Sequence, residues 1–343
     1  MSASLTLAGT LAAQIIGYRA GSRDAEKTAD DQRKQLDQTF KEQRDQLEKT
    51  LDEQRTRTLN ERFATAAEQL GSDKPAVRLA GVYAMAGLAD DWPESRQTCV
   101  DVLCGYLRMP YEPDRGADDP EPQRVAFRAA REVRHTVIRV ISAHLREAAA
   151  VSWQGLDFDF TGTVFDGGQF YGAEFSGGRV RFDGAEFSGG TVYLNETQFS
   201  GAEVSFYGAR FSGGTVDFRF AWFSGGVVYF TEAEFSGGTV LFLLAQFRGG
   251  SVMSPDAEFS GGTVDFDGAR FSEGEVNFYD TKFSSGRADF HRAEFSGGRV
   301  RFRGAMFSGG TVDFSNPRAW SRPPEFPWAD APPPGVQLPP EAA

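Results

Sequence analysis

Residues 173–196 read AEFSGGRVRFDG and then AEFSGGTVYLNE, the same twelve-residue unit twice in succession. The pattern A-x-F-S-G-G-x-V-x-F-x-x continues through the second half of the chain at a constant spacing of 12. Its first phenylalanine falls at Phe175, Phe187, Phe199, Phe211, Phe223, Phe235, Phe247, Phe259, Phe271, Phe283, Phe295 and Phe307. A short repeat at a fixed period predicts a solenoid.

Each unit contains two apolar pairs spaced by two, the period at which side chains of an extended strand point to the same side. Ala173 and Phe175 form one pair, and Val180 and Phe182 form the next. The Gly-Gly step between them suits a corner that needs positive φ or leaves no room for a Cβ atom. Twelve residues are too few to enclose an interior, so we expect two units, 24 residues, in each four-sided coil.

The number of faces sets the length of the rod. From Phe158 to Phe314 the chain has 27 such faces, about 6.75 coils. At the ~4.8 Å spacing of neighbouring strands this gives a rod of about 32 Å. Stacked phenylalanines fill its middle, so the predicted fold class is a set of helices followed by a β-solenoid without a pore.

The alternating A-x-F-x-x and V-x-F-x-x pieces of residues 156–316 resemble the pentapeptide-repeat proteins. The resemblance implies a right-handed quadrilateral β-helix. Residues 62–84 are similar to the helical module that precedes the repeats in actinobacterial members of this family. The regular two-residue insertion after every second piece departs from the plainest members, which run five by five.

The whole chain divides by composition into five parts. We expect a weakly apolar segment at 1–23, a long charged helix at 24–70, a helical module at 71–150, the solenoid at 151–316 and a Pro-rich tail at 317–343. Trp320, Phe326 and Trp328 are large apolar groups in that tail. Either they fold back onto the last coil, which we favour, or they form a peptide motif for a partner.

The long helix contains no Pro and no Gly between Arg23 and Gly71. Its sequence repeats with a period of 11, as Leu36/Leu47 and Phe40/Leu51 show, which suits a nearly straight coiled coil. A solvated helix of this length needs a partner helix, so we expect a homo-oligomer through residues 24–70. The alternative is a rigid solvated spacer of about 66 Å.

Residues 4–18 carry no charge and are moderately apolar. They are borderline for a membrane-spanning helix, which needs about 20 apolar residues. If they span, Arg19 and Arg23 would hold the rest of the chain on the cytoplasmic side, at the inner face of the cell membrane. The alternative is a docked or frayed helix of a cytoplasmic protein. The absence of a basic leading region disfavours a secretory signal.

The formal net charge of −12 disfavours direct nucleic-acid binding through a basic surface. The spacings of Cys99/Cys104 and of His135/His144 do not bring either pair to one helix face, so we interpret all four as ordinary core or surface residues. No catalytic constellation, metal site or cofactor motif is predicted. The protein is therefore expected not to be an enzyme.

Two outward features of the solenoid are candidate sites. The first is an apolar interaction patch made of Phe220, Trp222, Leu241, Leu243 and Leu244, because residues 24 apart stack in neighbouring coils. The helical half or the tail covers it in the alternative interpretation. The second is an acidic column of Asp265, Asp289 and Asp313, which could bind a cation weakly or mimic a row of phosphates.

Ser254 occupies a slot that Phe or Leu fills elsewhere, and it is followed by Pro255. Pro cannot donate to an inter-coil ladder, so we expect a bulge there, as a repeat defect or a binding notch.

The leading functional hypothesis is a non-enzymatic scaffold that binds a protein partner. The alternative, allowed by the family resemblance, is an acidic DNA mimic that acts on DNA gyrase or another topoisomerase.

Overall fold

The computed structural model describes residues 3–112, 120–329 and 331–340, and the side chains from residue 27 onward with the exception of residue 29. The chain forms two compact units, Met1–Glu61 and Arg62–Ala343. Helix α1 (Ala3–Leu70) runs through the first unit and into the second. The sequence indicated separate helices at residues 4–18 and 24–70, but these are one continuous helix from Ala3, because the intervening glycines weaken a helix without ending it.

Among the described residues, we find no helix that is long and apolar enough to cross a membrane. The predicted anchor at residues 4–18 lies where the structure describes the backbone but not the side chains. Membrane attachment through this segment therefore stays a prediction.

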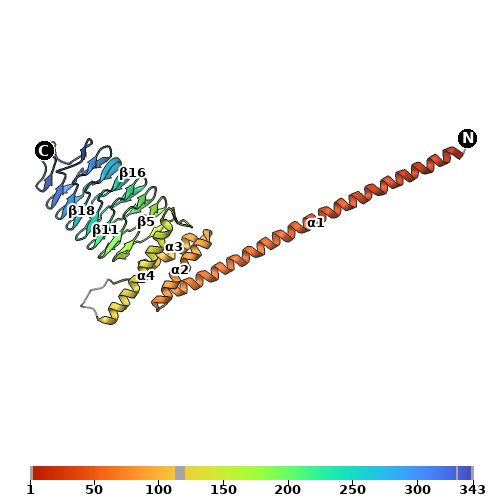
Figure 1. Ribbon diagram of the computed structural model, residues 1–343, viewed down its shortest axis with the longest axis horizontal. Coiled ribbons are helices and arrows are strands. Elements are labelled where there is room, and N and C mark those ends of the chain that lie inside the picture. Colours follow the sequence, from red (N-terminus) through yellow and green to blue (C-terminus); the bar gives the residue numbers. More distant parts are fainter. Residues whose placement is uncertain (1–2, 113–119, 330, 341–343) are drawn as a thin grey trace. The chain divides into compact units, whose positions relative to one another are not determined.

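A helical module packs against the beginning of the solenoid (Figure 1). It consists of α2 (Pro75–Asp91), the short 3-10 helix η1 (Pro93–Ser95), α3 (Arg96–Arg108) and α4 (Glu121–Leu145). The apolar faces of α2, α3 and α4 meet in a common core with residues such as Val82, Leu103 and Ile141, all fully buried. Because α3 contacts β1 and α4 contacts β3, the module covers the first coil.

The solenoid has four parallel stacks of short strands, as predicted, and about seven turns. Stack I comprises β1 (Phe158–Asp159), β5 (Arg179–Arg181), β9 (Glu203–Ser205), β13 (Val227–Tyr229), β16 (Gln246–Met253), β19 (Arg270–Asn277) and β23 (Arg299–Arg301). Stack II comprises β2 (Val164–Phe165), β6 (Glu186–Phe187), β10 (Arg210–Phe211), β14 (Glu234–Phe235), β17 (Glu258–Phe259), β20 (Lys282–Phe283) and β24 (Met306–Phe307).

Stack III comprises β3 (Gly168–Gln169), β7 (Thr191–Tyr193), β11 (Thr215–Asp217), β15 (Thr239–Leu241), β18 (Thr263–Asp265), β21 (Arg287–Asp289), β25 (Thr311–Asp313) and β27 (Val336–Gln337). Stack IV comprises β4 (Glu174–Phe175), β8 (Gln198–Phe199), β12 (Trp222–Phe223), β22 (Glu294–Phe295), β26 (Ala319–Trp320) and the first halves of β16 and β19. These two long strands continue around the corner between stacks IV and I, which therefore form one sheet.

Through the regular part of the solenoid, partners in neighbouring coils are 24 residues apart, which confirms two units per coil; the first coil is shorter, with Phe165 paired to Phe187. Phe211, for example, pairs with Phe187 on one side and with Phe235 on the other. The rings of Phe211 and Phe235 stack at 4.7 Å with planes 3° apart. This ring separation matches the spacing of strands in a sheet, so one register satisfies both the backbone ladder and the aromatic core. The buried rings leave no pore.

Glycine is required where a corner approaches the previous coil closely. At Gly190 φ is +60°, and a Cβ atom would lie 2.3 Å from the carbonyl oxygen of Asp166. Any side chain there would collide with backbone, which explains why the Gly-Gly step recurs in the sequence.

The Pro-rich tail forms the end of the solenoid. Trp320 pairs in register with Phe295, and Val336 pairs with Val312, so the sheets continue past the predicted end at residue 316 to Gln337. Phe326 stacks on Phe302 with ring centroids 5.6 Å apart. The tail thus folds back onto the last coil, because its aromatic residues continue the interior stacks.

The predicted bulge at Ser254 is wrong. The amide of Ser254 donates to the carbonyl of Asn277 at 2.7 Å, and the carbonyl of Pro255 accepts from the amide of Glu232 at 3.0 Å. Pro255 occupies a corner position, and the ladder bonds come from the residues on either side of it. The small Ser254 side chain is buried and borders an apolar gap of about 20 Å³. This favours a tolerated repeat defect.

Candidate functional site

The residues of the apolar patch lie together at the corner between stacks III and IV. Leu241 pairs with Asp217 and Asp265 on stack III, and Trp222 pairs with Gln246 on stack IV. Phe220, Leu243 and Leu244 occupy the corner itself. Phe220 is 45% exposed and Trp222 is 38% exposed, whereas the three leucines are half-buried. Neither the helical module nor the tail removes this corner from solvent.

The backbone at this corner is strained in a way the sequence did not reveal. Phe220 and Leu244 both have φ of 58°, in the left-handed region that bulky residues rarely adopt. Gly172, Glu196, Gly268 and Arg292 occupy the same corner in other coils, and all four have positive φ. Positive φ is therefore common to this corner, and the large apolar side chains distinguish the coils of Phe220 and Leu244 from the others.

Trp222 makes a further contact on this surface. The guanidinium of Arg248, one coil further on, lies 4.9 Å from the centre of the Trp222 indole ring. This cation–π contact holds the ring against stack IV. The patch therefore combines apolar surface with an adjacent positive charge.

The acidic column has the predicted geometry, since Asp265 pairs with Asp289 and Asp289 pairs with Asp313. Burial, followed by the charges of Asp289 and Asp267, raises the pKa of Asp265. The sequence analysis missed Arg287, which binds Asp289 at 2.6 Å and approaches Asp313 to 3.7 Å. Arg287 shares the outer surface of β21 with Asp289, two residues away, and weakens the negative field of the column.

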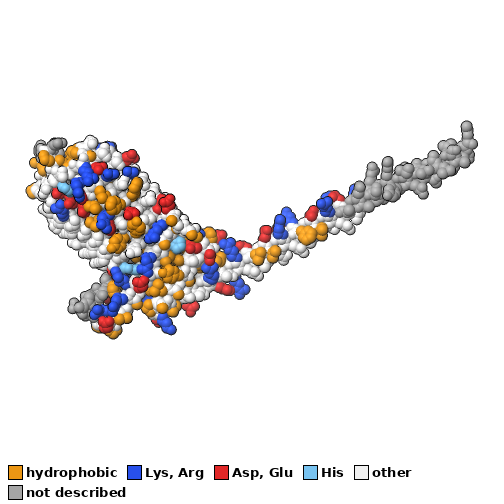
Figure 2. Space-filling view, in the orientation of Figure 1, with side chains coloured by type: hydrophobic (Ala, Val, Ile, Leu, Met, Phe, Trp, Pro, Cys, Tyr) orange, Lys and Arg blue, Asp and Glu red, His pale blue; other side chains and the backbone are white. Residues whose placement is uncertain are grey.

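On the visible face of the solenoid, acidic and basic side chains are interspersed (Figure 2). Arg292 pairs with Asp267, and Arg301 binds Glu275 at 2.5 Å. Because these ion pairs separate the acidic groups from one another, the negative charge of the solenoid does not form one continuous surface.

A buried carboxylate joins the helical module to the first coil. Asp166 follows β2 and accepts hydrogen bonds from Tyr111 Oη at 2.7 Å, Arg131 Nε at 3.0 Å and His135 Nε2 at 3.1 Å. Burial alone would raise the pKa of Asp166, but the hydrogen bonds from His135 and Tyr111 outweigh burial and lower it. The carboxylate is therefore held ionised at the junction.

His144 belongs to a second junction cluster. Its Nε2 atom lies 3.1 Å from Oδ2 of Asp90, and Trp153 Nε1 donates to Oδ1 of the same carboxylate at 2.9 Å. The His144 and Trp153 rings stack at 4.0 Å. His135 thus joins the module to the first coil, and His144 joins α4 to α2 within the module; the sequence hides both roles because the partners lie 31 and 54 residues away.

The two cysteines are buried within α3. Burial raises the pKa of Cys99 to about 11 and that of Cys104 to about 12. Both thiols stay protonated at neutral pH, and this agrees with their interpretation as core residues. Within the described residues no group of three or more His, Cys, Asp or Glu side chains could hold a metal ion.

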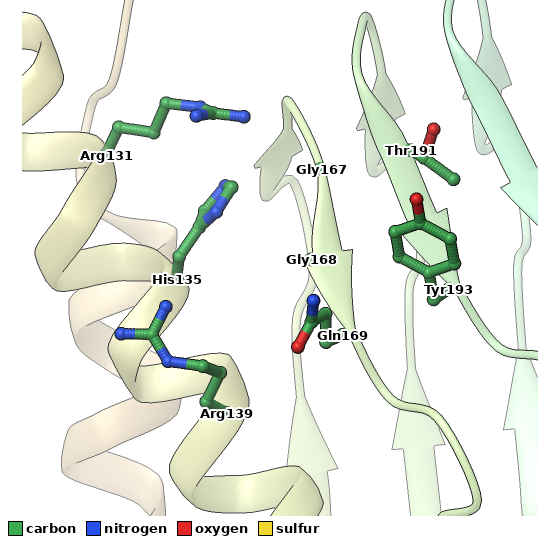
Figure 3. Close-up of a pocket in the computed structure, with 8 residues that line it drawn as sticks. All are labelled: Arg131, His135, Arg139, Gly167, Gly168, Gln169, Thr191 and Tyr193. Atoms are coloured by element: carbon green, nitrogen blue, oxygen red, sulfur yellow. The ribbon is translucent and has the colours of Figure 1, made fainter.

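A hollow of about 270 Å³ lies between α4 and the first strands of stack III (Figure 3). We call it the α4–β3 hollow. Its lining residues are Arg131, His135, Arg139, Gly167, Gly168, Gln169, Thr191 and Tyr193. Arg131 and His135 reach from α4 toward the strands, and Gln169, Thr191 and Tyr193 stand opposite them. The sequence analysis did not identify this site, because its residues come from three elements.

The stacks and their filled interior define a repeat protein of the β-solenoid class. The family model described as "Pentapeptide repeats (9 copies)" matches residues 170–222. The resemblance to pentapeptide-repeat proteins seen in the sequence is therefore confirmed by a family match over residues 170–222. No curated protein and no solved structure matched the chain.

Proposed function

We propose that this protein is a non-enzymatic scaffold that binds a protein partner through the apolar patch of Phe220, Trp222, Leu241, Leu243 and Leu244. The observation that carries the proposal is the exposure of the large Phe220 and Trp222 side chains on the outside of the solenoid. An exposed apolar cluster on a mostly polar rod is the usual character of a protein interface. The partner is expected to present an apolar surface with an acidic group near Arg248.

Histidine and cysteine side chains often take part in enzymatic catalysis. In this protein, the contacts and burial of two histidines and both cysteines support the proposal of a binding role. His135 binds Asp166 at the junction of the module with the solenoid, and His144 binds Asp90 within the module. Cys99 and Cys104 are fully buried thiols. Their structural contacts favour a binding role for the protein over a catalytic one.

Charge substitutions in the patch test the proposal. Phe220→Glu and Leu244→Glu should fold normally, because Glu196 and Glu232 have φ of 58° and 57° at equivalent corner positions. A pull-down with the native protein should recover a partner that both variants lose. Tyr279→Glu is the matched control, since Tyr279 is 44% exposed on another part of the solenoid. Equal recovery by the native protein and the patch variants would exclude the patch.

We propose further that the long helix pairs with the same helix of a second copy. Leu36, Phe40, Leu47 and Leu51 are each more than half exposed, and hydrophobic side chains recur among charged ones along this helix (Figure 2). Residues 27–61 carry nine acidic and eight basic side chains. The net charge of this segment is therefore close to zero, and the electrostatic repulsion between two copies is small. A stripe with period 11 lets straight helices remain in contact along their length.

Light scattering on the full chain tests this pairing. The native protein should have at least twice the mass of one chain, and Leu47→Glu should reduce it toward that of a monomer. Thr56→Glu serves as the control, because residue 56 is nine positions from Leu47 and faces the opposite side of the helix. A native monomer would refute self-association.

Attachment to the inner face of the cell membrane through residues 4–18 remains part of the proposal. Ultracentrifugation of the expressed protein with residues 1–20 intact is the test. Recovery in the membrane pellet supports attachment, and recovery in the supernatant opposes it.

A DNA mimic acting on a topoisomerase is the second candidate function, favoured by the ladder of Asp265, Asp289 and Asp313. The pairing of Arg287 with this ladder opposes it. We therefore expect no effect of the protein on DNA supercoiling by gyrase. Inhibition that Asp289→Asn abolishes would reverse the order of the two candidates.

A further inference from the structure

We propose that the α4–β3 hollow binds a small oxyanion, a phosphate or carboxylate group carried by a small molecule. All six of its lining side chains other than glycine carry a hydrogen-bond donor, that of His135 being engaged by Asp166, and none is a carboxylate. Arg131 and Arg139 are permanently charged donors. The lining contains two arginines and no acidic side chain, although the chain as a whole has a formal net charge of −12.

The acidic groups nearest the hollow are already engaged. Asp166 accepts from His135 on Oδ1 and from Arg131 and Tyr111 on Oδ2. Glu132 accepts from Arg139 Nη2 at 2.8 Å. These carboxylates balance part of the positive charge, but they lie outside the lining of the hollow and leave donors within it.

Several donors at the hollow have no protein acceptor. In the described part of the chain, the side chains of Gln169, Thr191 and Tyr193 make no hydrogen bond, and Arg139 bonds only through Nη2. A guanidinium has five N–H groups, so Arg139 can keep its contact with Glu132 and still donate to a ligand. A ligand rich in acceptors is the chemistry that complements this excess of donors.

The size of the hollow limits the ligand. About 270 Å³ is just below the range of roughly 300–1,000 Å³ that is common for pockets of drug-sized molecules. Gly167, with φ of +127°, leaves space in the hollow on the strand side, because a Cβ atom there would lie 3.3 Å from Cε1 of His135. An anion or a small acid fits, and a larger ligand would extend into solvent past Tyr193, which is 38% exposed.

Occupation of the hollow would link α4 to β3 and β7, and so the module to the solenoid. A ligand that binds only the folded state raises the midpoint of thermal unfolding. Binding and thermal stability therefore provide two independent readouts.

The test is a titration of the full chain with inorganic phosphate, and separately with acetate, at constant ionic strength. We expect saturable binding with a Kd on the order of 1 mM for at least one anion, and a higher unfolding midpoint. Binding of phosphate alone assigns a phosphoryl group, and binding of acetate alone assigns a carboxylate. Either result supports the site.

Substitutions locate the binding. Arg139→Gln should weaken it about tenfold, because charge-assisted hydrogen bonds contribute about this factor. Tyr193→Phe, which removes only the hydroxyl, should weaken it about threefold to tenfold. Arg124→Gln, on the same helix but outside the hollow, should leave it unchanged. Absence of saturable binding, or equal affinity in the native protein and both hollow variants, would overturn the proposal.

Discussion

Phe220 and Leu244 occupy the same corner of two successive coils, and each holds its backbone at φ of 58°. The amide of Phe220 donates to the carbonyl of Leu243 at 3.1 Å, so the ladder fixes this geometry from one coil to the next. Side chains that point outward from such a position contribute little to the interior. We therefore expect substitutions in the patch to leave the packing of the core unchanged.

Replacement of Phe220 by Gly tests this expectation. Loss of its contacts should be offset by relief of the left-handed strain, about 1–2 kcal/mol, so we expect the free energy of unfolding to change by less than about 1 kcal/mol. Phe218→Ala, at a fully buried ring two residues away, should cost about 3–5 kcal/mol. Denaturant unfolding of both variants provides the comparison. A loss of about 3 kcal/mol in Phe220→Gly would mean that Phe220 is a core residue.

The Asp166 junction predicts a loss of stability in acid. Because the folded state holds the pKa of Asp166 below its ordinary value, its contribution is present above the unfolded-state pKa and declines as pH falls through the folded-state pKa. Asp166→Asn should lower stability at neutral pH by about 3 kcal/mol, because Arg131 and His135 lose a buried anionic partner.

Tryptophan fluorescence, to which the buried Trp153 contributes, can follow this unfolding as a function of pH. The native protein and Asp166→Asn should converge in stability below the folded-state pKa. A constant difference between them down to strong acid would show that the carboxylate charge is unimportant.

Asp265 predicts the opposite dependence on pH. Its pKa is raised, chiefly by burial, so the folded state favours the protonated form. The associated stability is full below the unfolded-state pKa and is lost as pH rises through the folded-state pKa. Asp265→Asn should therefore stabilise the protein at pH 7 and have little effect in acid. Thermal midpoints at both pH values measure this, and destabilisation at pH 7 would contradict it.

Removal of residues 317–343 should expose the last coil. Phe302 and Phe314 would lose the Phe326 ring, which lies 5.6 Å and 5.3 Å from them between centroids. The unpaired edges of the last strands would become accessible to other chains. We expect a lower unfolding midpoint and association that grows with concentration, measured by scattering at several concentrations. A truncated protein that matches the native one in both would show that the tail is dispensable.

The fold of the repeat part could be predicted closely because the same packing requirement recurs in every coil. Each interior ring must stack on the ring 24 residues away, so the period of the letters is the period of the coil. The C-terminal end of the solenoid was harder to predict from the sequence. In the tail, Trp320 and Phe326 continue the stacks without the Gly-Gly corners that mark the repeat.

The sites depended on contacts that no local pattern encodes. The pairing of Asp166 with His135 joins a strand to a helix, and only the packed structure brings them together. The strain at Phe220 arises from its corner conformation, whereas its letter alone suggested only exposure. The α4–β3 hollow likewise exists only after the module has docked.

The pairing of two units in each coil also constrains how this gene can change length. Duplication of a single unit would turn everything downstream by half a revolution about the rod axis and carry surface features beyond it to the opposite side. Duplication of two units would add one complete coil and lengthen the rod by about 4.8 Å. Every surface residue would then stay on the same side of the rod. Growth or shrinkage in even steps is therefore the route that keeps an existing binding surface in place.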